Sequence, residues 1–251
     1  MNALLKKGIA TAALVVALAS PAQAALIDIE LSLVIDVSGS VDTNEYNLQM
    51  DGYAQAFRDA SVIQNIENST HGIAVNAVFF ASNYYNTVLD AFTVLQTAAD
   101  ATNFANILDT FIRPGSGGTV ISSGIDRAVE LLLANDLDAT VGTVIDVSGD
   151  GTSFYDNTVS RDAAVAEGFT INGIAIGGDT ITDYYRDNVI GGTDAFVIEA
   201  TTFEDFENGI ISKLQIETQT APAPTPVPAP AGVAIMLLAG MGLILSRKLK
   251  R

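Results

Sequence analysis

The sequence predicts an α/β fold in which a mostly parallel, six-stranded sheet carries helices on both faces. The first observation is an alternation, along residues 27–218, of short runs rich in β-branched apolar residues and longer helix-like stretches. The second is that "LSLVID" and "TVIDVS" are almost continuously apolar, as expected for central strands that are covered on both sides. No change in composition divides this range, so we expect one domain.

The expected elements follow one another at regular spacing. We predict strands at 27–36, 73–80, 88–94, 141–147, 170–176 and 195–199. We predict helices between them at 43–63, 98–111, 120–134, 158–167, 182–189 and 203–216. The third strand follows the second too closely for a helical crossover, so it is expected to be an antiparallel edge strand.

The two ends of the chain differ from this body. Residues 1–24 combine Lys6 and Lys7, an apolar run at 9–19 and the small-x-small pattern Ala22-Gln23-Ala24, which indicates a secretory signal peptide. Residues 219–230 form a Pro/Ala-rich linker that favours extended polyproline II. Residues 231–251 are a short hydrophobic segment with a basic tail. The run is short for a bilayer span, which needs roughly 20 residues, and its basic end suits the cytoplasmic side.

Charge and residue types exclude several functions. The chain has 12 Lys and Arg against 29 Asp and Glu, and six of the basic residues but none of the acidic ones lie in the two ends. A body this acidic repels nucleic acid and anionic lipid. Cysteine is absent and His71 is the only histidine. This excludes disulfides, thiolate metal sites and multi-histidine zinc sites, and it argues against a Ser-His-Asp hydrolase.

The segment "DVSGS" at the end of the first strand carries one carboxylate and two hydroxyls, on Asp36, Ser38 and Ser40. A turn that leaves a strand can direct all three at one point, and oxygen ligands suit a hard cation such as Mg²⁺, Ca²⁺ or Mn²⁺. The pattern alone leaves a second interpretation open, in which Ser40 and Asp42 only cap the following helix.

Two further segments belong to the same edge of the sheet. The glycine-rich stretch "RPGSGGTVISSGI" precedes a predicted helix and contains Thr119. It lacks the lysine of a phosphate-binding loop. A second "VIDVSG" segment ends another central strand and is followed by Asp150. Ligands of open α/β sheets bind outside the carboxyl ends of the strands, so we expect these residues to meet there.

Together these motifs resemble a von Willebrand factor type A (VWA) domain with a metal-ion-dependent adhesion site (MIDAS), over residues 25–218. The resemblance implies a three-layer Rossmann-like VWA fold. It also implies that a divalent cation (Mg²⁺, Mn²⁺ or Ca²⁺) is held by the family's five positions, which match Asp36, Ser38, Ser40, Thr119 and Asp150. Thr119 and Asp150 would change between direct and water-mediated contact when an acidic ligand binds. The partner would be a protein or polysaccharide that presents a carboxylate, and no enzymatic activity is implied.

The sequence departs from the family pattern at Gly149, where the family usually has threonine. This departure concerns the hydrogen bonds around the ligands, not the ligand set. "DVSGSVDTNEY", "DVSGDG" and "GIAIGGD" are similar to a bacterial branch of VWA domains whose function is uncharacterised.

The C-terminal end resembles a PEP-CTERM or VPLPA-CTERM sorting signal, through "VPAPAGVAIMLLAGMGLILSRKLKR". In that family an exosortase-type enzyme in the membrane recognises the tail and often removes it, in Gram-negative bacteria. The resemblance implies export through the inner membrane, followed by membrane anchoring or release to the cell surface or the medium. Ala229 stands where the motif has Glu, so the enzyme that would act is left open.

Two other functions remain as alternatives. The stretch "DGT" at 150–152 is similar to phosphotransferase loops, which suggests a metal-dependent, phosphatase-like hydrolase, but Ser148 stands where the first Asp should be. The stretch 146–157 partly matches an EF-hand calcium loop, with Asp146, Ser148 and Asp150 at its first, third and fifth places but Asn157 at its twelfth. This would suggest a calcium-binding structural protein. Asp146 also fits a buried, hydrogen-bonded carboxylate.

Overall fold

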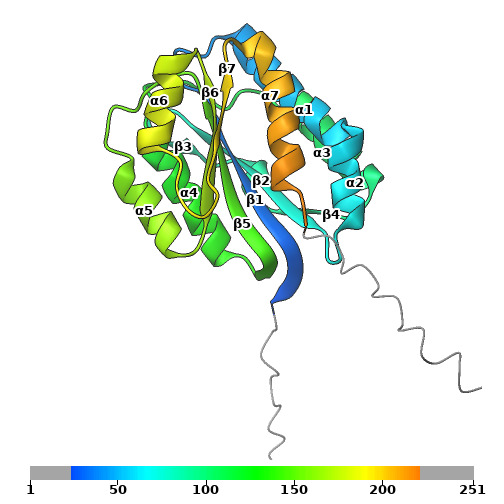
Figure 1. Ribbon diagram of the computed structural model, residues 1–251. Coiled ribbons are helices and arrows are strands. Elements are labelled where there is room, and N and C mark those ends of the chain that lie inside the picture. Colours follow the sequence, from blue (N-terminus) through cyan, green and yellow to red (C-terminus); the bar gives the residue numbers. More distant parts are fainter. Residues whose placement is uncertain (1–23, 221–251) are drawn as a thin grey trace, which may run out of the picture.

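The computed structural model describes residues 24–220, in which a seven-stranded sheet forms the middle layer (Figure 1). Its strand order is β3-β2-β1-β5-β6-β7, and β4 pairs with β2. The strands are β1 (Ala25–Asp36), β2 (Ile73–Phe80), β3 (Tyr84–Tyr85), β4 (Thr93–Leu95), β5 (Leu137–Gly149), β6 (Thr170–Ile176) and β7 (Val197–Ala200). All pairs are parallel except those of β3 and β4 with β2. The α/β class and the mostly parallel sheet are therefore confirmed.

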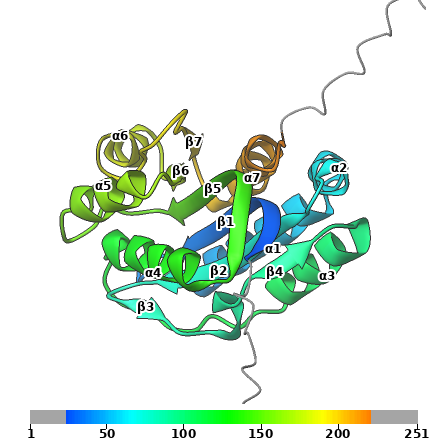
Figure 2. The same ribbon diagram turned by 90° about the horizontal axis from the view of Figure 1, so that it is seen from below.

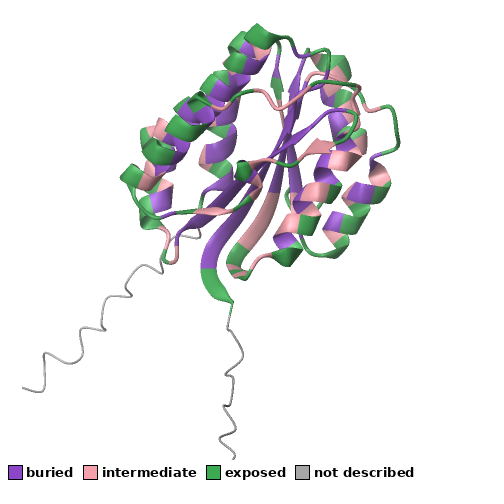
Figure 3. Ribbon diagram, turned by 180° about the vertical axis from the view of Figure 1, so that it is seen from behind, coloured by how far each residue is buried: buried purple, intermediate pink, exposed green. Residues whose placement is uncertain are grey.

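Helices cover both faces of the sheet. The helices α1 (Thr43–Arg58), α2 (Ala60–Asn68), α3 (Ala98–Asp109) and α7 (Phe203–Glu217) pack on one face, and α4 (Ile121–Ala134), α5 (Thr158–Ala166) and α6 (Asp179–Asn188) pack on the other (Figures 1 and 2). β2 and most of β1 are buried between them, the first half of β5 is partly exposed, and the other exposed residues lie mainly on the outer sides of the helices and in loops (Figure 3). None of the described helices is long and apolar enough to cross a membrane.

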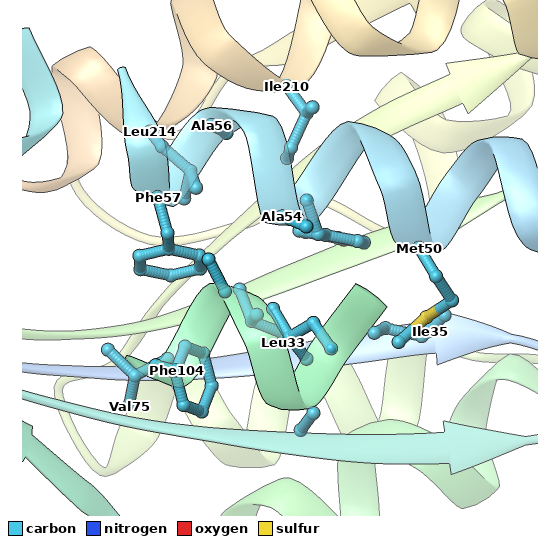
Figure 4. Packing of buried hydrophobic residues seen from close by; sticks show 14 of the residues in the cluster. Leu33, Ile35, Met50, Ala54, Ala56, Phe57, Val75, Phe104, Ile210 and Leu214 are labelled. Carbon is cyan, nitrogen blue, oxygen red and sulfur yellow. The ribbon is translucent and has the colours of Figure 1, made fainter. Parts of the chain in front are cut away.

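The hydrophobic core divides into two clusters, one on each face of β1. Leu33 and Ile35 pack against α1, α3 and α7, where they meet Met50 and Phe104 among others (Figure 4). Val34 belongs to the opposite cluster, with residues of α4, α5 and α6. Successive side chains of a strand point to opposite faces. Because both faces of β1 are covered, all of its side chains are apolar or buried, which explains the nearly continuous apolar run in the sequence.

The expected helix at 43–63 is two helices, because Asp59 separates them. Asp59 has an extended backbone and ends α1, and its side chain accepts hydrogen bonds from the amides of Ser61 and Val62 at the start of α2. Such a capping carboxylate satisfies amides that have no partner within the helix.

The expected third strand, at 88–94, is only partly a strand: its first half is the 3₁₀ turn η1 (Val88–Asp90), and its second half lies mostly in β4. The short strand β3, which precedes this range, was not predicted and raises the strand count from six to seven. Thr87 and Asp90 form a reciprocal capping box around that turn, and this local hydrogen bonding competes with strand pairing. β3 and β4 nevertheless both pair antiparallel with β2, as expected for this edge. The predicted signal peptide, most of the linker and the C-terminal hydrophobic segment lie outside the described residues.

Candidate metal site

The carboxyl ends of β1 and β5 lie side by side and bring Asp36 and Asp150 to the same edge of the sheet (Figure 1). Ile35 pairs with Ser148 in the parallel register. Asp36 is the last residue of β1, and Asp150 directly follows β5. The sheet register therefore explains why two residues more than one hundred positions apart meet.

Hydrogen bonds join four of the five predicted site residues into one chain. The amide of Ser38 donates to Oδ1 of Asp36 at 2.6 Å. The hydroxyls of Ser38 and Ser40 lie 3.1 Å apart, and the Ser40 hydroxyl donates to Oδ1 of Asp150 at 2.7 Å. The helix-capping alternative holds for Asp42, which accepts from the amides of Asn44 and Glu45, but not for Ser40.

Thr119 lies near this chain without being bonded to it. Its Oγ1 would be 3.7 Å from a Cβ built on Gly151, and its carbonyl accepts a hydrogen bond from the amide of Phe154 at 2.9 Å. Within residues 24–220, no hydrogen bond joins its side chain to the other four residues. The fold thus places Thr119 beside the segment that carries Asp150.

The carboxylate of Asp36 shows how well these residues suit a cation. Asp36 is fully buried, and its Oδ2 has no hydrogen-bond partner among the described residues. Burial raises the pKa of Asp36 to about 7, although hydrogen bonds from Ser38 oppose the shift. A buried carboxylate oxygen without a donor is costly, and a hard cation held by carboxylates and hydroxyls removes that cost. The residues present therefore fit a divalent ion.

The donor set is unusual in its low charge. The described residues contain no group of three or more His, Cys, Asp or Glu side chains that could hold a metal. Here two carboxylates, Asp36 and Asp150, are combined with the hydroxyls of Ser38, Ser40 and Thr119. A divalent cation in such a set keeps part of its positive charge, which a further anionic ligand can neutralise.

Gln49 is one contributor that the sequence did not reveal. It is fully buried on α1. Its Nε2 donates to the carbonyl of Asp36 at 3.0 Å, and its Oε1 accepts from the hydroxyl of Ser148 at 3.1 Å. Gln49 therefore fixes the ends of β1 and β5 to the same helix. The only signal in the sequence is a polar residue on the inward face of α1.

Arg113 is the second contributor that was missed. One of its terminal nitrogens donates to the carbonyls of Val37 and Ser38, at 2.8 and 2.7 Å. The amide of Gly39 also donates to the carbonyl of Gly117 at 2.7 Å. These bonds hold the glycine-rich loop against the loop that carries the two serines. The acceptors are backbone carbonyls, which every residue has, so the sequence does not indicate that Arg113 binds here.

The EF-hand alternative does not fit the geometry. Asp146 lies on β5 with its Oδ1 2.7 Å from Nζ of Lys213. Ser148 bonds to Gln49, and Asp150 bonds to Ser40. The three side chains of that motif thus have separate partners and do not surround a common point. The other interpretation, a buried and hydrogen-bonded carboxylate, holds in part: Asp146 is buried and forms an ion pair with Lys213, but neither of its oxygens has a hydrogen-bond partner among the described residues.

Gly149 leaves space that two other groups use. A Cβ at this position would lie 2.6 Å from the hydroxyl of Tyr185 and 2.7 Å from Oδ2 of Asp36. Tyr185 is fully buried on α6. At position 149 the family usually has threonine. Here the space that a threonine side chain would need is taken by the Tyr185 hydroxyl.

We expect Gly149→Ala to disturb the candidate site. The added methyl group would displace Asp36 or Tyr185, which should lower the free energy of unfolding by about 1–3 kcal/mol and weaken Mg²⁺ binding by roughly 10–100-fold. Thermal unfolding and calorimetric titration measure the two effects. Gly142→Ala is the matched control, because a Cβ there meets nothing within 4 Å on the same strand. If Gly149→Ala and Gly142→Ala bind Mg²⁺ with equal affinity, the proposal that Asp36 is a ligand of the cation is contradicted.

Solved structures share this fold at low sequence identity. Proximal thread matrix protein 1 from the mussel byssus, with a zinc-occupied MIDAS motif, matches with a TM-score of 0.57 and 16% identity, over 76% of this chain and 46% of that one. The pilus adhesin SpaC from Lactobacillus rhamnosus GG matches with a TM-score of 0.58 and 13% identity, over 79% and 31%. A von Willebrand factor type A protein from Catenulispora acidiphila matches with a TM-score of 0.52 and 15% identity, over 76% and 42%.

The chain thus spans less than half the length of these solved chains. The likeness shows the fold, which is that of a VWA domain. No curated protein matches the chain. A family model with the description "Protein of unknown function (DUF1194)" matches residues 26–222. The chain therefore belongs to the DUF1194 family and has the fold of a VWA domain.

Proposed function

We propose that the chain is an exported binding or adhesion module which engages an acidic group of its partner through a divalent cation. Asp36, Ser38, Ser40, Thr119 and Asp150 would hold the ion, which is Mg²⁺, Mn²⁺ or Ca²⁺. The observation that carries the proposal is the buried Oδ2 of Asp36, which has no partner among the described residues, while Oδ1 of the same carboxylate begins the chain of hydrogen bonds that ends at Asp150. The zinc-occupied MIDAS motif named for the mussel protein supports a metal at this place.

An acidic partner follows from the charges at the site. Ser40 is exposed and Asp150 is half-buried, so a partner can approach the ion from solvent. When bound, the ion supplies a local positive charge on a body that holds 6 basic and 29 acidic residues. A carboxylate is the anionic ligand that hard cations prefer in proteins. The partner would be a protein or a polysaccharide that presents such a group.

We propose a binding role in preference to hydrolysis. Asp150 bonds to Ser40, and Ser148, which stands where a phosphotransferase loop has its first Asp, is buried against Gln49. Arg113 contacts the neighbouring loop, which carries Ser38 and Ser40, and one of its terminal nitrogens donates to two backbone carbonyls there. This guanidinium is thus engaged with the backbone of that loop.

Export and sorting belong to the proposal as well. The N-terminal signal peptide would direct the chain across the inner membrane. The C-terminal hydrophobic segment would then contact the membrane and an exosortase-type enzyme, which leaves the domain anchored, at the cell surface or released. The adhesin named among the similar structures is consistent with a role at the surface.

A capture experiment tests the proposal. The full-length protein is immobilised and exposed to the host's surface fraction in Mg²⁺, in EDTA, and in Mg²⁺ with glutarate or its neutral diamide. We expect capture in Mg²⁺, loss in EDTA, and competition by glutarate alone. Asp126→Asn, an exposed change on α4, should capture like the wild type. Capture that persists in EDTA would contradict the proposal, and phosphatase turnover that vanishes in Asp150→Ala would favour the hydrolase.

A further inference from the structure

A cavity of about 440 Å³ lies at the opposite end of the sheet from the candidate metal site. We call it the basal cavity. It is bordered by the first half of β5, the start of β6, the loop before β7 and the end of α7, and its wall includes Val141, Val144, Asn172, Phe196, Ile216 and Glu217. Val141 and Ile216 are large apolar residues that are 49% and 52% exposed. The cavity therefore has an accessible apolar side, and the rest of its wall consists mainly of polar residues.

The wall carries two carboxylates: that of Asp194, which is exposed, and that of Glu217, which is buried and only partly satisfied by hydrogen bonds. The side chain of Glu217 is 1% exposed. Oε1 accepts from Nζ of Lys213 at 2.5 Å and from Nδ2 of Asn172 at 2.8 Å. Oε2 is buried and has no hydrogen-bond partner among the described residues. A buried carboxylate oxygen without a donor is costly, so a ligand that supplies one is favoured.

The charges behind the cavity wall are also unbalanced. Lys213 is fully buried and lies 2.7 Å from Oδ1 of Asp146, which is fully buried too. One ammonium group therefore faces two carboxylates, those of Asp146 and Glu217. Each of the five arginines in residues 24–220 has its hydrogen-bond partners elsewhere: Arg58 at Asp109, Arg113 at Val37, Arg127 at Asp90, Arg161 at Asp162 and Arg186 at Asp183. The cluster lacks one positive charge.

Two further features favour a cation here. Glu217 is the last residue of α7, and the C-terminus of a helix attracts positive charge. Burial, and after it the charge of Asp146, raises the pKa of Glu217. The carboxylate therefore takes up a proton more readily than usual, and a bound cation can replace that proton.

We propose that the basal cavity binds a small organic ammonium ion, with its charge against Glu217 and its hydrocarbon part along the apolar wall. The volume decides between an organic and an inorganic ion. A water molecule occupies about 30 Å³ of the liquid, so a metal ion would fill only a small part of the 440 Å³, and water would remain against Val141 and Ile216.

An alkyl chain contacts Val144 and Ile216. Phe196 adds apolar surface, and the face of its ring is directed at Nζ of Lys213, which lies 5.7 Å from the ring centroid. This site is separate from the proposed metal site.

The experiment uses n-pentylammonium as the probe and the full-length protein in saturating Mg²⁺. Amide chemical shifts locate the binding. We expect saturable shifts at Thr143 and Gln219, which line the cavity, and none at Ser38 and Ser40. 1-Pentanol has the same chain without the charge and should bind at least about tenfold more weakly. Equal shifts from pentanol, equal affinity for potassium ions, or shifts at the serines alone would overturn the proposal.

Glu217→Gln removes the charge and keeps the shape. Its carbonyl oxygen still accepts from Lys213 and Asn172, and Lys213 then balances Asp146, so the variant should fold. We expect it to bind n-pentylammonium at least about tenfold more weakly than the wild type. Glu207→Gln, at an exposed position of the same helix, is the matched control and should bind normally. An unchanged affinity in a folded Glu217→Gln variant would overturn the proposal, and Mg²⁺ binding should be normal in both variants.

Discussion

Replacing Asp36 with asparagine is expected to abolish binding of divalent cations while leaving the domain folded. Asparagine keeps the shape of the side chain and the acceptor for the Ser38 amide, but it removes the negative charge. Loss of one partner of a buried charge interaction costs about 3–5 kcal/mol, which is more than about 100-fold in affinity. Calorimetric titration with Mg²⁺, Mn²⁺ and Ca²⁺ measures the loss. Asp126→Asn should bind like the wild type, and cation binding that survives in Asp36→Asn would refute the assignment.

The stability of the metal-free protein separates this prediction from simple unfolding. Burial raises the pKa of Asp36 to about 7, from an ordinary value of 3.8. Between these values the folded state holds a proton that the unfolded chain releases, so this group's contribution to stability falls as pH rises towards 7. Asparagine has no such proton. At pH 8 in EDTA we therefore expect Asp36→Asn to be at least as stable as the wild type, and only the wild type should be stabilised by added Mg²⁺.

The elements of the fold were predictable because their signals are local. The apolar runs at β1 and β5 and the spacing of strands and helices follow from burial on both faces of a parallel sheet. The single helix predicted at 43–63 and the full strand predicted at 88–94 were wrong, and in both places an aspartate side chain forms local hydrogen bonds. Asp59 ends one helix and starts the next, and Asp90 closes a turn that takes the place of the first half of the predicted third strand. Such capping competes with regular structure and leaves no periodic pattern.

The positions of the candidate site were predictable to a similar extent. The sheet rule for ligands places Asp36, Ser38, Ser40 and Asp150 together, and hydrogen bonds do join them. Gln49 and Arg113 were not predicted, because their partners come from other segments and include backbone carbonyls. Tyr185 was not predicted, because its place beside Gly149 depends on how α6 packs. Whether a cation binds at these residues is a prediction that the titration of Asp36→Asn decides.

Lys213→Met is expected to give the largest loss of stability of any single substitution discussed. Lys213 is the sole lysine of residues 24–220 and is fully buried between Asp146 and Glu217, at 2.7 and 2.5 Å. Methionine fills a similar volume but leaves two buried carboxylates without a cation. Such a loss costs about 3–5 kcal/mol, a large part of the stability of an ordinary domain. Urea unfolding at pH 7 measures it.

The pH dependence identifies the cause of that loss. Burial and Asp146 raise the pKa of Glu217, and Lys213 lowers it, so removing the lysine raises this pKa further. A group with a raised pKa in the folded state stabilises the protein at low pH and loses that contribution as pH rises. The destabilisation by Lys213→Met should therefore be smaller at pH 5 than at pH 8.

Two comparisons complete the test of this buried cluster. Arg186→Met removes an exposed positive charge on α6 and should change the free energy of unfolding by less than about 1 kcal/mol. Adding Asp146→Asn and Glu217→Gln to Lys213→Met removes the uncompensated charges and should restore much of the stability, because replacing a whole buried ion cluster costs less than breaking it. A loss that is independent of pH and is not reduced in the triple variant would show that packing, not charge, is the role of Lys213.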